Sequence, residues 1–280
     1  MTGCISATST NTEVIDLSTF KTYLETLQAQ LIPSYTPPAT PGGYDVNHVL
    51  EMAALGPSIK ALPRYKTLDM EEFVTAVWLH NSDRPDSMVN FLHNKDYPRG
   101  DDGWKNDNWK PYLQKLLADS PFDDEARNRI IDAVLEHSKK DDEEGDSVLL
   151  TALRIADKVV RFGPLGMMGQ PANRGRTQMF YDPEEPFVYG STAEDKLRAV
   201  WNDYFRVLEW LTMLLKRALT EDELWSLVDK ADIADEVHYI RGVGRQIARV
   251  TGGENKVEEC VQKALGDLYK QFPPMQLVPA

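Results

Sequence analysis

Hydrophobic residues recur at spacings of three and four along most of this 280-residue chain, which is the period of amphipathic helices. No stretch of the sequence has the strict alternation of a half-buried strand, and no internal repeat stands out. The pattern therefore predicts an all-α fold. The predicted helices span residues 15–32, 44–55, 73–80, 87–93, 109–117, 125–138, 147–162, 191–216, 232–251 and 255–271.

Polar residues at the expected helix starts support these boundaries. Asp69 with Glu72, and Thr220 with Glu223, have the spacing of capping boxes, in which two side chains satisfy backbone amides reciprocally. Asp146 is the expected cap of the helix that follows it.

Three segments rich in proline, glycine or charged residues separate the helices and are expected to be irregular, at 33–43, 94–108 and 163–186. They predict the following organisation: an N-terminal helix and connector over 1–43, a helical core over 44–170, and a C-terminal helical extension packed on the core over 171–280.

Four polar side chains interrupt the apolar faces of four different predicted helices, and they are His48, His80, His137 and Asp157. His80, for example, follows Phe73 by seven residues and so lies on the same face of its helix. A buried imidazole needs a partner for each ring nitrogen. One such histidine alone is most simply a core residue bonded to a backbone carbonyl, but four such positions invite a common explanation.

Asp157 is the most informative of the four residues. A buried, unpaired carboxylate costs many kcal/mol or becomes protonated, so Asp157 needs a cation. The adjacent Lys158 points about 100° away around the helix. A divalent metal ion held by neutral imidazole nitrogens and this carboxylate would satisfy all four groups at once. The alternative is four separately satisfied polar groups, including a His–Asp pair.

Charge and composition limit the partners of the chain. A net charge of −13 argues against binding to nucleic-acid duplexes, which requires a basic face, but allows a small anionic substrate in a local basic pocket. Cys4 and Cys260 lie far apart and lack metal-ligand spacing. The sequence has no signal-peptide pattern and no apolar run of about 18 residues, so we expect a cytoplasmic protein without membrane contact.

The order of the four polar residues resembles that of the HD superfamily of metal-dependent phosphohydrolases. The family pattern is a His, then a His-Asp pair that ends a helix, then a distal Asp within an Ala-Asp-Lys/Arg turn. The matching segments are Tyr44–His48, His80-Asn81, Ile131–Ser138 and Leu153–Lys158, and Gly163–Gly169 resembles the loop after the distal Asp in some nucleotide-hydrolysing members. The resemblance covers about residues 44–170.

This resemblance implies an HD-domain-like, metal-binding helical core that hydrolyses phosphate ester or pyrophosphate bonds. His48, His80 and Asp157 would be metal ligands, and His137 would contact the substrate phosphate or serve as an additional ligand. Asn81 stands where the family has Asp. Its neutral amide oxygen would bind a divalent ion more weakly than a carboxylate, so we expect one metal per site, drawn from Mn, Fe, Ni, Co, Mg and Zn.

Further candidates for the site come from charged residues nearby in the sequence. Asp83 offers a substitute carboxylate or a general base, or else caps a turn. Four basic residues are candidate contacts of a substrate phosphate, although arginines at helix ends and in loops are also compatible with solvated positions. They are Arg84, Lys158, Arg174 and Arg176.

The leading hypothesis is an HD-type hydrolase that acts on a small phosphorylated molecule, such as a nucleotide. A second hypothesis is a degenerate HD module that binds a ligand or partner without catalysis. A third is an HD-fold iron oxygenase, which Asn81 disfavours because those enzymes bridge two irons with the Asp of the pair. By analogy with the family, a homodimer is a further expectation.

Overall fold

The regular structure of the chain is helical, as the sequence predicts. The computed structural model describes residues 17–35, 46–83, 105–138, 145–163, 200–251 and 256–274. Within these ranges no strand occurs, so the all-α prediction is confirmed. The predicted helix at 87–93 and the predicted boundary at residue 170 lie outside the described residues.

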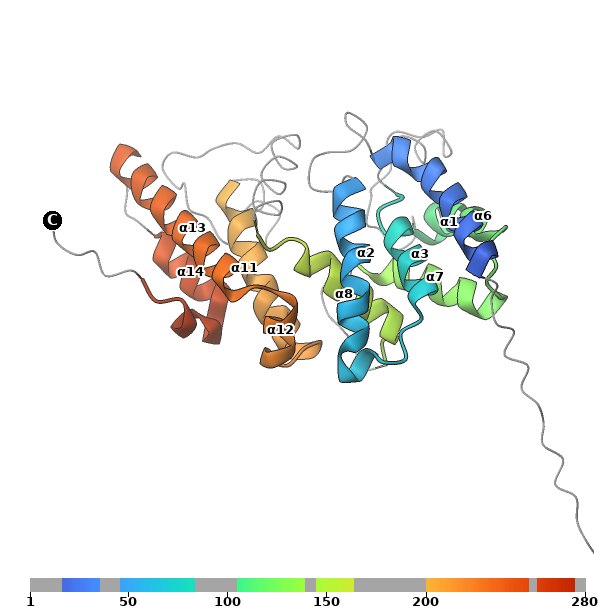
Figure 1. The fold of residues 1–280 in the computed structure, drawn as a ribbon. Helices are drawn as coiled ribbons and strands as arrows, with labels where there is room; N and C mark the ends of the chain where they lie inside the picture. Colours follow the sequence, from blue (N-terminus) through green and yellow to red (C-terminus); the bar gives the residue numbers. More distant parts are fainter. Residues whose placement is uncertain are drawn as a thin grey trace, which may run out of the picture.

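Helix α3 (Met70–Leu79) lies at the centre of a first group of helices (Figure 1). Its side chains are buried on all sides, which is typical of a helix surrounded by others. Those at most 1% exposed include Phe73, Ala76, Val77, Trp78 and Leu79. Helix α3 contacts α1 (Leu17–Leu31), α2 (Val46–Ala61), α7 (Asp124–Glu136) and α8 (Val148–Val159), and α6 (Lys110–Leu117) packs on α7.

Only one half of the capping box predicted at the start of α3 is formed. The Asp69 carboxylate accepts hydrogen bonds from the backbone amides of Glu71 and Glu72, as expected of an N-cap. The Glu72 side chain instead accepts a hydrogen bond of 3.1 Å from Arg129 on α7. A tertiary ion pair has therefore taken the place of the second bond of the capping box.

The predicted cap of α8 is wrong by one residue. Ser147, and not Asp146, is the N-cap, and its hydroxyl accepts a hydrogen bond from the Leu150 amide. Asp146 instead lies 2.6 Å from the guanidinium of Arg154. Because Arg154 is only 3% exposed, its charge requires a partner of opposite charge, and the partly buried Asp146 provides it.

The end of the predicted 94–108 loop is also ordered. Residues Lys105–Trp109 form a π-helical turn in which both terminal side chains are buried. The Trp109 indole donates a hydrogen bond to Ser82, and the Lys105 ammonium donates to the Leu135 carbonyl. These tertiary contacts, rather than a local helical pattern, explain why the segment is not a solvated loop.

A second group of helices follows at the C-terminal side (Figure 1). It comprises α11 (Val200–Arg217), α12 (Glu221–Leu227), α13 (Lys230–Thr251) and α14 (Val257–Leu265). The capping box of Thr220 and Glu223 is confirmed at the start of α12. The predicted helix over 255–271 changes at Gly266, whose φ of 52° ends α14, and continues as a 3₁₀ helix.

The two groups contact each other through α8 and α11, and through α2 and α12. Between them, the Tyr65 hydroxyl donates a buried hydrogen bond of 2.9 Å to the Ala218 carbonyl at the end of α11. Arg64 donates to the neighbouring Arg217 carbonyl at 3.2 Å. Of the helices in the described part of the chain, none has both the length and the apolarity needed to cross a membrane.

Candidate metal centre

His80 ends α3 and turns one ring nitrogen toward the interior of the first group. Its Nδ1 lies 2.6 Å from the carbonyl of Val77, three residues earlier. Because this carbonyl can only accept, Nδ1 carries the proton and Nε2 presents its lone pair. This hydrogen bond also satisfies a carbonyl that the helix end leaves without an intrahelical partner.

His137 ends α7 in the same manner. Its Nδ1 lies 2.6 Å from the Val134 carbonyl, and its ring meets the His80 ring edge to face at 5.4 Å between centroids. Burial and the neighbouring His80 lower the pKa of His137 to about 4. The imidazole is therefore neutral at ordinary pH, and its Nε2 is an acceptor rather than a cationic contact for phosphate.

His48 on α2 and Asp157 on α8 complete the cluster. The His48 Nε2 lies 3.1 Å from Asp157 Oδ1, and the His80 Nε2 lies 3.9 Å from the same oxygen. One ligand atom from each of the three residues lies within 4.8 Å of the others. Ligands that share one ion through bonds of about 2.1 Å are separated by roughly 3–4 Å, so this group could hold a metal ion.

Arg161, in the turn after α8, also reaches this cluster, and sequence reasoning missed it. Its Nη2 lies 3.3 Å from Asp157 Oδ1 and 3.2 Å from His48 Nε2. Burial raises the pKa of Asp157, but the hydrogen bond with His48 and the charge of Arg161 outweigh burial and hold the pKa well below its usual range. The spacing of four residues between Asp157 and Arg161 could have revealed this pair.

Asn81 hydrogen bonds to His80. Its Nδ2 lies 2.6 Å from His80 Nε2, so an amide hydrogen is donated to the lone pair of the ring. An NH₂ group is a donor and cannot ligate a metal ion. Turning the amide by about 180° would exchange its nitrogen and oxygen, and only that rotamer would allow the predicted role of Asn81 as a ligand.

The other predicted site residues have more varied positions. Asp83 is half-buried in the turn after α3, three residues beyond His80, and its negative charge acts on His137. Lys158 is half-buried on α8, where Arg161 supplies the ion pair to Asp157. The three arginines predicted to contact phosphate lie outside the described residues, and they are Arg84, Arg174 and Arg176.

The π-helical turn supports both histidine-bearing helix ends from one side. The Trp109 ring lies 6.2 Å from the His137 ring, and its Nε1 donates to Ser82 Oγ at 3.0 Å. The Lys105 ammonium donates to Ser138 at 2.9 Å, next to His137. Such turns occur frequently at functional sites. No local pattern in the sequence marks Lys105 or Trp109 for this role.

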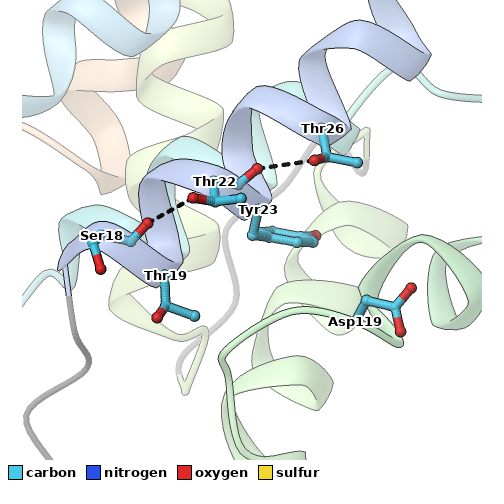
Figure 2. Close-up of a pocket in the computed structure, with 6 residues that line it drawn as sticks. All are labelled: Ser18, Thr19, Thr22, Tyr23, Thr26 and Asp119. Atoms are coloured by element: carbon cyan, nitrogen blue, oxygen red, sulfur yellow. Dashed lines mark hydrogen bonds between the residues drawn. The ribbon is translucent and has the colours of Figure 1, made fainter.

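A separate pocket lies beside α1, and none of the cluster residues lines it (Figure 2). Its lining consists of Ser18, Thr19, Thr22, Tyr23, Thr26 and Asp119. The Thr22 and Thr26 hydroxyls donate to carbonyls of their own helix. Burial raises the pKa of Tyr23, whose hydroxyl donates to the Leu116 carbonyl. Three of the six lining residues, Thr22, Tyr23 and Thr26, are thus committed to structural hydrogen bonds, and among the described residues the group that could hold a metal ion is the histidine cluster.

Comparisons with known proteins add little to this geometry. No protein-family profile matches the chain, and no curated protein matches it. The chain is similar to a protein from Lactobacillus plantarum whose crystal structure was solved as a structural genomics target. The match covers 85% of this chain and 98% of the Lactobacillus chain, with 11% sequence identity and a TM-score of 0.47. Likeness at this level carries no argument, so function has to be argued from the residues of the centre.

Proposed function

We propose that this chain is an HD-type hydrolase that binds one divalent metal ion and cleaves a phosphate ester or pyrophosphate bond of a small phosphorylated molecule, such as a nucleotide. The observation that carries the proposal is the convergence of His48, His80 and Asp157, whose ligand atoms lie within 4.8 Å of one another. They come from α2, α3 and α8, in the chain order that the HD resemblance implies.

The donor set suits a divalent ion of intermediate hardness. Two imidazole nitrogens and one carboxylate oxygen are typical ligands of Mn, Fe, Co, Ni and Zn. The His80 Nδ1–H donates to the Val77 carbonyl, and such a bond fixes the orientation of a metal-bound ring. His48, His80 and Asp157 would hold the ion, which lowers the pKa of a bound water and polarises a phosphoryl oxygen.

Two groups beside the ligands are suited to proton transfer. Asp83 is half-buried and close enough to influence His137, so a carboxylate and a neutral imidazole adjoin the ligand set. Asp83 would accept the proton of the attacking water, and His137 would accept a hydrogen bond from the substrate or the water. The basic residues predicted to contact phosphate, Lys158, Arg84, Arg174 and Arg176, would offset the net charge of −13 toward an anionic substrate.

Metal analysis of protein purified without chelator tests this proposal. We expect about one divalent ion per chain by mass spectrometry, and its loss in Asp157→Ala. Asp132→Ala removes an exposed carboxylate from α7 and is the matched control. Phosphate release from nucleotides and sugar phosphates then tests hydrolysis. Wild-type protein that takes up no divalent ion under any loading condition would refute the hydrolase proposal.

A second candidate function is a degenerate HD module that binds a ligand or partner without turnover. Two contacts favour it, because Asn81 and Arg161 both direct N–H groups at the atoms that would bind metal. Bound metal with no phosphate release from the substrate panel would favour this module. An iron-bound protein that consumes oxygen would instead indicate the HD-fold oxygenase.

A further inference from the structure

Each ligand atom of the group formed by His48, His80 and Asp157 lies beside an N–H group of a neighbouring side chain. Arg161 Nη2 lies 3.2 Å from His48 Nε2 and 3.3 Å from Asp157 Oδ1. Asn81 Nδ2 lies 2.6 Å from His80 Nε2. Hydrogen-bond donors therefore already lie beside all three atoms that a metal ion would need.

Asp157 and Arg161 compete for the Nε2 atom of His48. Its Nε2 is within hydrogen-bond distance of both Asp157 and Arg161, yet one ring nitrogen cannot donate to the carboxylate and accept from the guanidinium at once. A cation between His48 and Asp157 would let both act as acceptors. Arg161 currently supplies that positive charge.

The positive charge of Arg161 would also repel a divalent ion bound beside it. With Asp157 ionised and Arg161 always protonated, the pair is neutral. A divalent ion added beside an unmoved guanidinium would leave a net charge of about +2 in a site where Arg161 is only 3% exposed. Like charges at such separations repel strongly where water is scarce, so ion and guanidinium compete for one position.

We infer that Arg161 is a positioning residue that acts as the built-in counter-cation of Asp157, and that a divalent ion binds only by displacing its guanidinium from His48 and Asp157. This inference rests on the proposed metal site and adds a residue that sets its affinity. Arg161 thereby holds the Asp157 carboxylate in place when no ion is bound, and it weakens metal binding relative to an otherwise identical site.

Helix α8 provides a matched control for the test. Arg154 is also 3% exposed and also pairs with an aspartate, Asp146, at 2.6 Å. Its guanidinium donates to Asp146 and to the Glu136 carbonyl, which lie outside the ligand set of His48, His80 and Asp157. Arg154→Gln therefore removes an equivalent buried ion pair without removing charge from the centre.

The experiment is a calorimetric titration of full-length protein with Mn²⁺ after removal of metal by chelator. We expect Arg161→Gln to bind Mn²⁺ about tenfold or more tightly than wild type, and Arg154→Gln to bind it as wild type does. Arg161→Lys should fall between them, because an ammonium keeps the charge but not the planar fork. If Arg161→Gln does not fold, the Arg161→Lys variant still tests the inference, since it is also expected to bind Mn²⁺ more tightly than wild type.

A second measurement separates this inference from the proposed function. In chelator, urea unfolding of Arg161→Gln, Asp157→Asn and the double variant should show that the two changes are non-additive, as a direct pair requires. Additive changes, or Mn²⁺ affinity that is unaltered in Arg161→Gln and Arg161→Lys, overturn the inference while wild-type metal binding keeps the hydrolase proposal. Mn²⁺ bound by Arg161→Gln but not by wild type supports the inference and refutes the hydrolase.

Discussion

At the scale of single residues, His80 and His137 use one ring nitrogen to bond a backbone carbonyl and leave the other as an acceptor. The Nδ1 atoms of His80 and His137 donate to carbonyls three residues back, as structural core histidines do. The Nε2 of His80 accepts a hydrogen bond from Asn81 and lies 3.9 Å from Asp157 Oδ1, a separation that two ligands of one ion can have. The structural and the metal-binding interpretations of His80 are therefore compatible, because each uses a different nitrogen.

Asn81→Asp is predicted to strengthen metal binding. The present amide donates to His80, whereas a carboxylate would present only acceptors and would add a negative charge beside the ligands. We expect affinity for Mn²⁺ to rise by about tenfold or more, measured by calorimetry. Asn128→Asp adds the same charge to an exposed position of α7 and should leave affinity unchanged. Equal affinity of Asn81→Asp and wild type would contradict this prediction.

The ligand candidates could be predicted from the sequence because each interrupts an apolar helical face. Arg161 was missed although it falls within the predicted 147–162 helix, because its role follows only from its i, i+4 pairing with Asp157 and not from its own position on an apolar face. The roles of Lys105 and Trp109 could not be predicted from the sequence for another reason. Their burial results from contacts with Ser82, Ser138 and Leu135, which are distant in sequence.

At the scale of elements, helix periodicity is a reliable predictor where the apolar face is continuous, and helix ends are less so. The Asp146 prediction failed by one residue because Ser147 competes locally for the cap while Arg154 requires the Asp146 carboxylate. The capping box at Thr220 succeeded because Thr220 and Glu223 satisfy each other's backbone amides.

Two glycines of α13 should respond oppositely to alanine. A methyl group at Gly244 would overlap the Val257 side chain on α14, whereas one at Gly242 would meet nothing within 4 Å. Gly244→Ala should therefore destabilise the protein by about 1–3 kcal/mol through overpacking. Gly242→Ala should stabilise it by up to about 1 kcal/mol through helix propensity. Urea unfolding measures both, and a stabilising Gly244→Ala would contradict the close packing of α13 and α14.

At the scale of the whole molecule, a buried carboxyl lies where the two helical groups meet. Glu236 on α13 is 1% exposed, and neither of its oxygens completes a hydrogen bond. The amide of Gly163, just after α8, approaches it without reaching that geometry. Tyr204 is a further neighbour, and burial, Tyr239 and Glu236 together raise its pKa to about 12. No sequence pattern predicts this junction, because it depends on how α13 packs near the end of α8.

This carboxyl should make the stability of the protein depend on pH. Burial raises the pKa of Glu236 from 4.5 to about 8, so between these values the folded protein holds a proton that the unfolded chain has released. The free energy of unfolding should therefore fall as pH rises from about 5 to 8.

Glu236→Gln removes the titration and retains the shape of the side chain. Its free energy of unfolding, relative to wild type, should be about 1–4 kcal/mol higher at pH 9 than at pH 5, measured by urea unfolding. Asp235→Asn, which removes an exposed carboxyl from the same helix, is the control for a general loss of negative charge. A difference between Glu236→Gln and wild type that stays constant from pH 5 to pH 9 would mean that Glu236 titrates as it does in the unfolded chain. The packing of α13 against the end of α8 would then have to admit water to this carboxyl.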